Sequence, residues 1–106
     1  MIIFNKDVKL GQLNPEVDRK ILCHSPQMMV CEIFLKKGSV VPDHSHPHEQ
    51  ATYLVSGRLR FTLDGETKEI GPRDAAYCGP NQTHAVTALE DSLVMDFFAP
   101  RRDDFL

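Results

Sequence analysis

The sequence predicts a single all-β domain, and three observations support this fold class. Short runs rich in β-branched and aromatic residues recur along the whole chain, as is typical of strands. Residues that favour turns, namely Gly, Pro, Asn and Asp, separate these runs at close and regular intervals. The apolar period of about 3.6 residues that marks an amphipathic helix is almost absent. Many short strands of this kind indicate a sandwich or a jelly-roll barrel.

We expect eight strands, each defined by its composition and by the turn residues at its ends. The first has polar ends around an apolar centre, the second is mostly apolar, the third runs from a polar start into an apolar half, and the fourth alternates polar with apolar residues. The fifth is short and polar, the sixth is short and apolar, and the last two are again mostly apolar. In chain order they cover residues 19–24, 28–35, 44–55, 58–63, 67–70, 75–78, 84–89 and 93–98.

The connections between these strands carry residues that favour or impose a turn. Asp64-Gly65 is the clearest hairpin signal, because this pair suits the tight two-residue turns that join antiparallel strands. Eight strands are also the number that closes a barrel around a small interior site. The predicted turns lie at 37–39, 56–57, 64–66, 71–74 and 79–82.

Composition limits the classes of function. With 106 residues, 42% hydrophobic and 25% charged, the chain has the size and apolar content of one folded domain over residues 1–106. The net charge of −3 and the lack of basic clusters interleaved with aromatic residues argue against a nucleic-acid partner. No apolar run approaches the roughly 18 residues that span a bilayer, so we expect no membrane association.

The three cysteines, Cys23, Cys31 and Cys78, are odd in number, form no C-x-x-C pair and lie in apolar stretches. This pattern favours reduced, buried thiols over disulfides or metal ligands. Because reduced thiols are typical of the cytoplasm, we expect a cytoplasmic protein.

Histidines gather at one point of the sequence. His44, His46 and His48 occupy alternate positions after a glycine turn, and Gln50 follows at the next even step. In a single strand over 44–55 alternate side chains share a face, so we expect His44, His46 and Gln50 to line one wall. Imidazole nitrogens and a neutral amide oxygen accept several divalent transition metals, among them Ni, Zn, Fe, Mn and Cu. The cluster therefore predicts one divalent metal ion and leaves its identity open.

The fourth ligand must come from elsewhere in the chain. His84, which follows the turn at 79–82 and begins a later strand, is the best candidate. His48 shares the spacing of the cluster, but it is equally suited to orienting a ligand or contacting a substrate. The alternative for the whole cluster is a set of histidines that hydrogen-bond locally at a polar strand end.

The same residues resemble the first motif of the cupin superfamily, in which a glycine, an H-x-H pair, a glutamate and a second glycine follow at fixed spacings. Here the order is Gly38, five residues, His44-Ser-His46, three residues, Gln50, six residues and Gly57, so glutamine replaces the glutamate. The second cupin motif is degenerate, and of its landmarks only His84 is intact. The resemblance implies a double-stranded β-helix, that is a jelly-roll barrel, with a metal held at these four positions.

A narrower resemblance covers nearly the whole chain. The His-x-His-x-His-x-Gln core, the strand at 50–57 and the ending at 95–106 look like the KdgF-type cupins, called pectin degradation proteins. These proteins are implicated in uronate catabolism, and their metal is ligated by His and Gln. The resemblance implies a metal-dependent conversion of the ring form of 4,5-unsaturated monouronates, from pectin or alginate, into linear 5-keto-4-deoxyuronate. It also implies that a D-x-F-x-P-x-R segment serves the reaction, which maps onto Asp96, Phe98 and Arg102.

The chemistry of that segment agrees with such a role. Asp96 is the only polar residue of the strand at 93–98, and a carboxylate among apolar neighbours needs a cation or a wet cavity. It can accept and return a proton, while Arg102 offers a two-pronged donor for a carboxylate and Phe98 an apolar wall. The alternative is a structural ion pair between Asp96 and Arg102.

Tyr53 and Arg60 complete the candidate site as possible substrate-binding residues with His48, although strand residues of these types more often pack or face solvent. Two other functions stay open for a chain of this kind. One is a cupin that binds a small anion without turnover, and the other is an iron-dependent cupin oxygenase. Exposed sheet edges are often buried in dimers, so we also expect a homodimer.

Overall fold

Alternation of buried and exposed side chains along the longer strands builds the molecule around one interior. β5 (Glu49–Ser56) shows this most clearly, because Gln50, Thr52 and Leu54 are buried and the residues between them are exposed. β3 (Met28–Leu35) and β10 (Ser92–Ala99) bury bulky apolar residues in the same way. A period of two places one face of a sheet against the core and the other in solvent.

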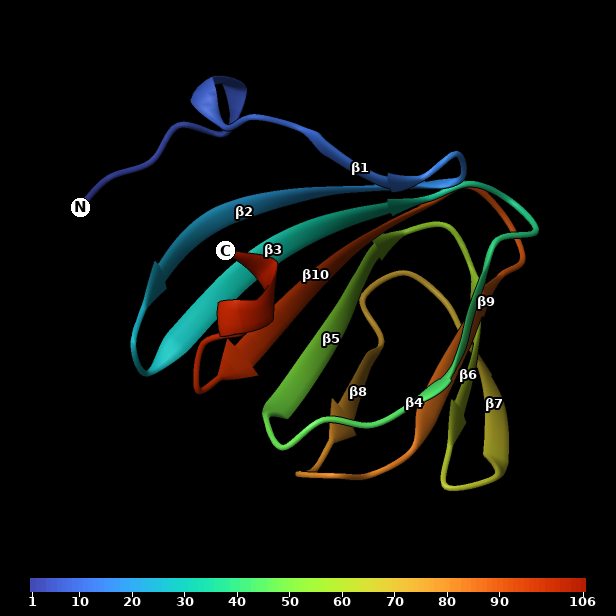
Figure 1. Ribbon diagram of the computed structural model, residues 1–106. Helices are drawn as coiled ribbons and strands as arrows, with labels where there is room; N and C mark the ends of the chain where they lie inside the picture. The colour runs from blue at the N-terminus through green and yellow to red at the C-terminus, as the bar shows by residue number, and fades with distance from the viewer.

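The computed structural model describes residues 1–106 and consists of two antiparallel sheets (Figure 1). The six-stranded sheet has the order β1-β2-β3-β10-β5-β8, and the four-stranded sheet has the order β4-β9-β6-β7. None of the helical segments has the length and apolar character that crossing a membrane requires. The remaining elements are η1 (Asn5–Asp7), β1 (Gly11–Asn14), β2 (Val17–Ser25), β4 (Val40–His44), β6 (Leu59–Leu63), β7 (Glu66–Ile70), β8 (Ala75–Cys78), β9 (His84–Ala88) and η2 (Asp103–Phe105).

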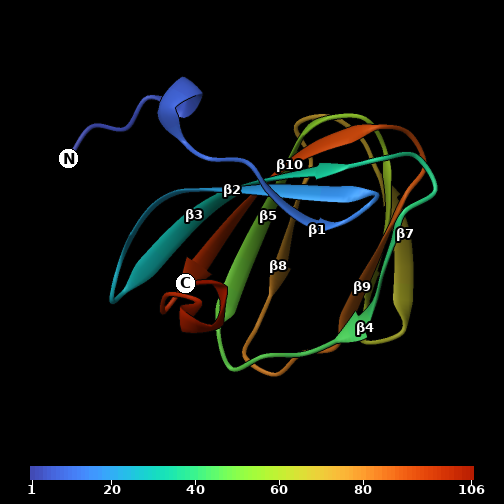
Figure 2. The same ribbon diagram turned by 45° about the horizontal axis from the view of Figure 1, so that its top comes forward.

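The two sheets face each other across the interior, as the turned view shows (Figure 2). At one end an apolar cluster contributed by both sheets closes the space between them, and it comprises Val17, Leu35, Leu54, Leu59, Ala88 and Val94. Toward the other end the inward positions of the same strands become polar. On β5, for example, the inward-facing side chains change from Leu54 to Thr52 and then Gln50 toward this end. Both views place the C-terminal turn η2 beside the end of β10, at this polar end.

The predicted all-β jelly roll is confirmed, and two details of the prediction are wrong. There are ten strands rather than eight, because β1 and β4 were not expected. The single strand predicted over 44–55 is also interrupted, since β4 ends at His44 and β5 begins at Glu49. Pro47 in the intervening loop has no N–H for a strand ladder, and the His46 carbonyl instead accepts a hydrogen bond from the Asn81 amide at 2.7 Å.

Candidate metal centre

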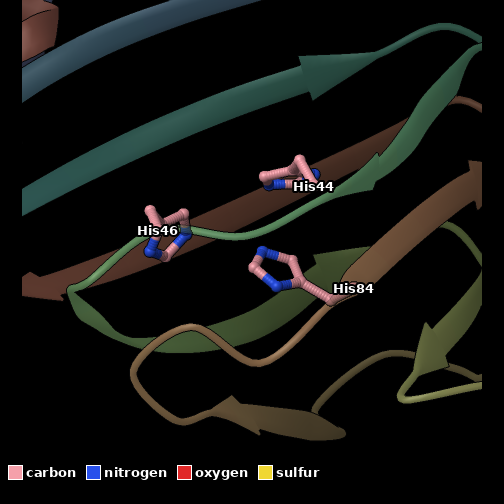
Figure 3. Close-up of side chains that lie close together, drawn as sticks. All are labelled: His44, His46 and His84. Carbon is pink, nitrogen blue, oxygen red and sulfur yellow. The ribbon is translucent and has the colours of Figure 1, made fainter.

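Three histidines from different parts of the fold point at one another (Figure 3). His44 ends β4 and His84 begins β9, and the two are directly paired across the four-stranded sheet. His46 lies in the loop after β4. One ring nitrogen of each lies within 4.8 Å of the others. Strand pairing and one loop therefore assemble a three-nitrogen group at the polar end of the interior.

Backbone carbonyls fix the orientation of two of these rings. Nδ1 of His44 donates to the Pro42 carbonyl and Nδ1 of His84 donates to the Gln82 carbonyl, each at 2.9 Å. A carbonyl only accepts, so both rings carry their proton on Nδ1 and offer the lone pair of Nε2 to the centre. Nε2 of His84 is buried and has no hydrogen-bond partner. A buried nitrogen left unpaired in this way is costly, and a bound metal ion would satisfy it.

Gln50 supplies the fourth donor from the six-stranded sheet. Its Oε1 lies 2.9 Å from Nε2 of His46, and its amide nitrogen donates to the Thr52 hydroxyl at 2.9 Å. The Thr52 hydroxyl in turn donates to the Asp96 carboxylate at 2.7 Å, so it must accept from the amide of Gln50. This chain of hydrogen bonds turns the amide oxygen of Gln50 toward the histidines.

The electrostatic state of the histidines suits a metal ion. Burial lowers the pKa of His46, with a further contribution from the charge of Arg102, and burial also lowers the pKa of His84. Both rings are therefore neutral near pH 7, as metal ligation requires. Three imidazole nitrogens and one amide oxygen form a neutral donor set that fits one divalent transition metal.

Asp96 lies next to this donor set on the wall of the interior. Its Cα is paired with Thr52 on β5 and with Cys31 on β3. Burial raises the pKa of its carboxyl to about 6, although the hydrogen bond from Thr52 acts in the opposite direction. The Gln50 amide also reaches the carboxylate, at 3.5 Å. A proton acceptor thus lies one hydrogen bond away from a candidate metal ligand.

Arg102 does not pair with Asp96, so the ion pair considered above as an alternative is wrong. Its guanidinium donates twice to Asp104, at 3.0 and 2.8 Å. It also lies over the rings of Phe98 and Phe105, with Cζ 5.2 and 4.2 Å from the ring centroids. The two-pronged donor predicted for a substrate carboxylate is therefore already engaged within the protein.

A cavity of about 310 Å³ connects these groups, which lies at the lower end of the range of small-molecule sites, roughly 300–1,000 Å³. Apolar side chains of both sheets form part of its wall. The polar part of the wall consists of Arg19, His44, Gln50, Thr52, His84, Asp96 and Arg102, and the aromatic part of Phe98 and Phe105. Candidate metal ligands, a carboxylate and two arginines thus line one cavity.

Two predicted substrate-binding residues do not reach the cavity. Tyr53 is exposed and lies on the face of β5 opposite to Gln50 and Thr52. Arg60 is exposed between the buried residues Leu59 and Phe61, and so faces outward from β6. The expectation that they line the cavity is therefore corrected.

His48 lies beside His46, at the edge of the candidate metal centre. Its ring centroid is 5.4 Å from that of His46, and its Nδ1 is buried without a hydrogen-bond partner. It does not line the cavity and is not part of the three-histidine group. The three cysteines are unpaired, two of them buried, and none joins the metal group.

Three cavity residues were not singled out from the sequence. Thr52 follows Gln50 at an even step on a strand and so had to share its face. Arg19 is two positions after Val17 on β2 and therefore shares its inward face, where it is the only charged residue. Phe105 carried no such signal, because it lies in a short turn that follows the last strand.

Comparisons with known proteins identify relatives of this chain. A model of the cupin domain matches residues 32–99. The chain is 32% identical over 97 residues to the pectin degradation protein KdgF of Dickeya dadantii (strain 3937), covering 90% of this chain and 88% of that protein.

Solved structures give the same picture. KdgF from a Halomonas species superposes with a TM-score of 0.96 at 36% identity, over 100% of this chain and 98% of the other. An RmlC-like cupin from Shewanella frigidimarina NCIMB 400 gives a TM-score of 0.94 at 25% identity, over 97% and 93% of the two chains. A predicted oxalate decarboxylase from Thermotoga maritima shares the fold alone, with a TM-score of 0.85 at 15% identity over 95% and 100%. The chain therefore belongs to the cupin family and, within it, to the KdgF type.

Proposed function

We propose that this protein is a metal-dependent enzyme of uronate catabolism. It converts the ring form of 4,5-unsaturated monouronates, released from pectin or alginate, into linear 5-keto-4-deoxyuronate. The likeness to a pectin degradation protein over nine tenths of the chain supports this role. A small sugar acid also suits the size and the mixed polar and apolar wall of the cavity.

The observation that carries the proposal is the position of Asp96. Its carboxylate lines the cavity, is held by Thr52 and by the amide of Gln50, and forms no ion pair. Arg102, the cation nearest to it in the predicted segment, is bound to Asp104 instead. This carboxylate has no cation partner and lies beside a candidate metal ligand. It is therefore suited to exchanging protons with a small molecule bound in the cavity.

The reaction balances with a single base. Removing the proton from the hydroxyl at C1 breaks the bond between C1 and the ring oxygen and leaves an aldehyde at C1. The electrons released move through the ring oxygen to form the ketone at C5, and a proton returned to C4 removes the double bond. One proton therefore moves from O1 to C4 without change of composition, and Asp96 is the group that accepts and returns it.

The remaining residues orient the substrate. Phe98 forms an apolar wall between the metal centre and Arg102, with its ring 6.0 Å from that of His46. A divalent metal bound by the four donors would supply Lewis acidity, which stabilises negative charge on a neighbouring oxygen. The neutral amide of Gln50 leaves more positive charge on such an ion than a carboxylate ligand would.

The test follows the absorbance of the conjugated double bond when metal-loaded protein meets freshly prepared unsaturated galacturonate. Wild-type protein is expected to consume the chromophore, and Asp96→Asn to lose about 10²- to 10⁴-fold in kcat with its metal content unchanged. Asp18→Asn, on the outer face of β2, is the matched control and is expected to retain full activity.

Two results would contradict the proposal. If wild-type protein binds the uronate but never consumes the chromophore, the molecule is an anion-binding cupin. If the chromophore disappears only with uptake of oxygen by the Fe(II)-loaded protein, the molecule is an oxygenase. Retention of wild-type kcat in Asp96→Asn would remove Asp96 from the mechanism.

A further inference from the structure

Arg19 is a charged residue in an otherwise apolar inward row. It lies on β2 between Val17 and Ile21, both of which pack into the interior. Its side chain is partly buried and lines the same cavity as the metal-ligand candidates. It donates no hydrogen bond and forms no ion pair in the structure. The five N–H donors of its guanidinium therefore have no acceptor within the protein.

An aromatic ring holds this guanidinium in place. Cζ of Arg19 lies 3.7 Å from the centroid of the Phe105 ring, within the range of a cation–π contact. The Phe105 ring in turn packs edge-on against Phe98, at 5.6 Å between centroids. Stacking uses the face of a guanidinium and leaves its N–H edge free to bind an acceptor. The arrangement therefore orients Arg19 without occupying its donors.

The two arginines of the cavity differ in whether their N–H donors are already bonded within the protein. Arg102 also lies over Phe105, but Asp104 takes two of its donors. Burial lowers the pKa of Arg19, and the charge of Arg102 acts in the same direction. A partly buried cation that lies near a second cation and bonds no carboxylate is stabilised by any anion that enters.

We propose that Arg19 binds the carboxylate of the small sugar acid that enters this cavity, in place of the role that the sequence assigned to Arg102. This inference rests on the proposed function, because it names the contact by which that same site recognises its substrate. A guanidinium edge matches a carboxylate with two parallel hydrogen bonds, and a neutral sugar offers no equivalent. Arg19 is therefore the residue that selects acids over neutral sugars.

The experiment compares Arg19→Gln and Arg19→Lys with Arg73→Gln in metal-loaded protein. Arg73 lies in an exposed turn outside the cavity and bonds no side chain, so it is the matched loss of one positive charge. For each variant, KM and kcat are measured on unsaturated galacturonate and on its methyl ester. Binding of saturated galacturonate and of galactose is measured by calorimetric titration, alongside metal content and thermal unfolding.

We expect Arg19→Gln to raise KM for the acid by about 10- to 100-fold, as loss of a charged hydrogen-bond pair does, with kcat changed much less. KM for the methyl ester is expected to stay within a few-fold of wild type, so the preference for the acid collapses. Arg19→Lys keeps the charge but lacks the two-pronged N–H edge, so its KM for the acid is expected to lie between those of wild type and Arg19→Gln. Arg73→Gln should match wild type.

An unchanged preference for the acid in Arg19→Gln overturns the inference while leaving the proposed function intact. Conversely, an inactive wild type that binds galacturonate through Arg19 overturns the proposed function alone. Failure of wild type both to turn over and to bind galacturonate overturns both. If Arg19→Gln does not fold, Arg19→Lys is the deciding variant. A side chain whose only role is to stack on Phe105 can be replaced by lysine without loss of the preference for the acid. An unchanged preference in Arg19→Lys would therefore contradict the inference.

Discussion

Gln50 connects the candidate metal centre with Asp96, the proposed proton acceptor. One end of its amide faces the histidines and the other donates to Thr52 and Asp96. A glutamate, which the general cupin motif has at this position, would offer an acceptor at both ends. The amide therefore does two things that an ionised carboxylate cannot do at once: it presents an oxygen to the three-histidine group and a donor to Asp96.

Replacement of Gln50 by glutamate tests this double role. The variant places two carboxylates beside each other, so the second one raises the pKa of Asp96 and one proton is shared between them. We expect metal to be retained or bound more tightly, while kcat on unsaturated galacturonate falls by at least about tenfold. Metal content by mass spectrometry and steady-state rates measure the two effects.

Gln12→Glu on the exposed strand β1 is the control for an added negative charge. Wild-type kcat in Gln50→Glu would show that the amide donor has no part in the reaction. Loss of metal from this variant would show that a carboxylate cannot replace the amide of Gln50 in the donor set.

Single residues were predictable from the sequence where a polar type interrupted an apolar pattern. Asp96 was found because it is alone in its strand, and His84 because it begins one. The partners of these residues were not predictable, because pairing depends on the register of strands far apart in the chain. Thr52 lies beside Asp96 only through the β5–β10 register, and Asp104 neutralises Arg102 only through the turn after the last strand.

At the scale of elements, the interrupted strand after β4 explains how the ligands converge. A continuous strand over 44–55 would have placed His46 about 7 Å from His44 and Gln50 about 14 Å from His46, since alternate residues of a strand lie about 7 Å apart. The loop at 45–48 instead carries the chain from the four-stranded to the six-stranded sheet. His44 and Gln50 thereby approach His46 from opposite walls. The chain therefore does not adopt the alternation expected of one strand over 44–55, and Pro47 was the signal against it.

The connection between β5 and β6 makes the same crossing between sheets and depends on Gly57. Its φ is +97°, and a Cβ there would meet the Ser92 side chain and lie 2.7 Å from the Ser92 Cα. We expect Gly57→Ala to destabilise the fold by about 2–4 kcal/mol, from the positive φ together with the clash. Urea unfolding measures the difference in free energy of unfolding.

Gly65→Ala is the matched control, because Gly65 has a φ of +81° and nothing within 4 Å of a Cβ. It should lose only the roughly 1–2 kcal/mol that the positive φ itself costs. Equal losses in the two variants would show that the contact with Ser92 contributes nothing.

At the scale of the whole molecule, the candidate metal ligands come from both sheets. His44 and His84 belong to the four-stranded sheet and Gln50 to the six-stranded sheet, so a bound ion would link both walls. An ion that binds only the folded state stabilises it by about 2.7 kcal/mol at 100 times its Kd. For a domain of this size that raises Tm by about 10 °C or more.

Thermal unfolding of chelator-treated protein, with and without added Ni²⁺, Zn²⁺ or Mn²⁺, measures this gain. We expect at least one of these ions to raise Tm in wild type and in His24→Ala, whose histidine is exposed on β2. The gain should be lost in His84→Ala. A Tm that responds to none of the ions would contradict the metal centre.

The outer face of the six-stranded sheet bears on the assembly of the protein. Exposed apolar side chains lie on it, including Phe34, Tyr53, Val55 and Phe97. The homodimer expected from the sequence stays a prediction, and this face is where it would form.

Arg19 and Phe105 meet across the cavity although most of the chain lies between them. A contact between such distant residues requires closure of a long loop, and the pairing of β2, β3 and β10 in one sheet provides that closure. A partly folded molecule with paired strands but a detached C-terminal turn would therefore have the barrel without the contact between Arg19 and Phe105. If Arg19 recognises acids as proposed, selectivity for acids depends on the C-terminal turn and would be lost when that turn detaches.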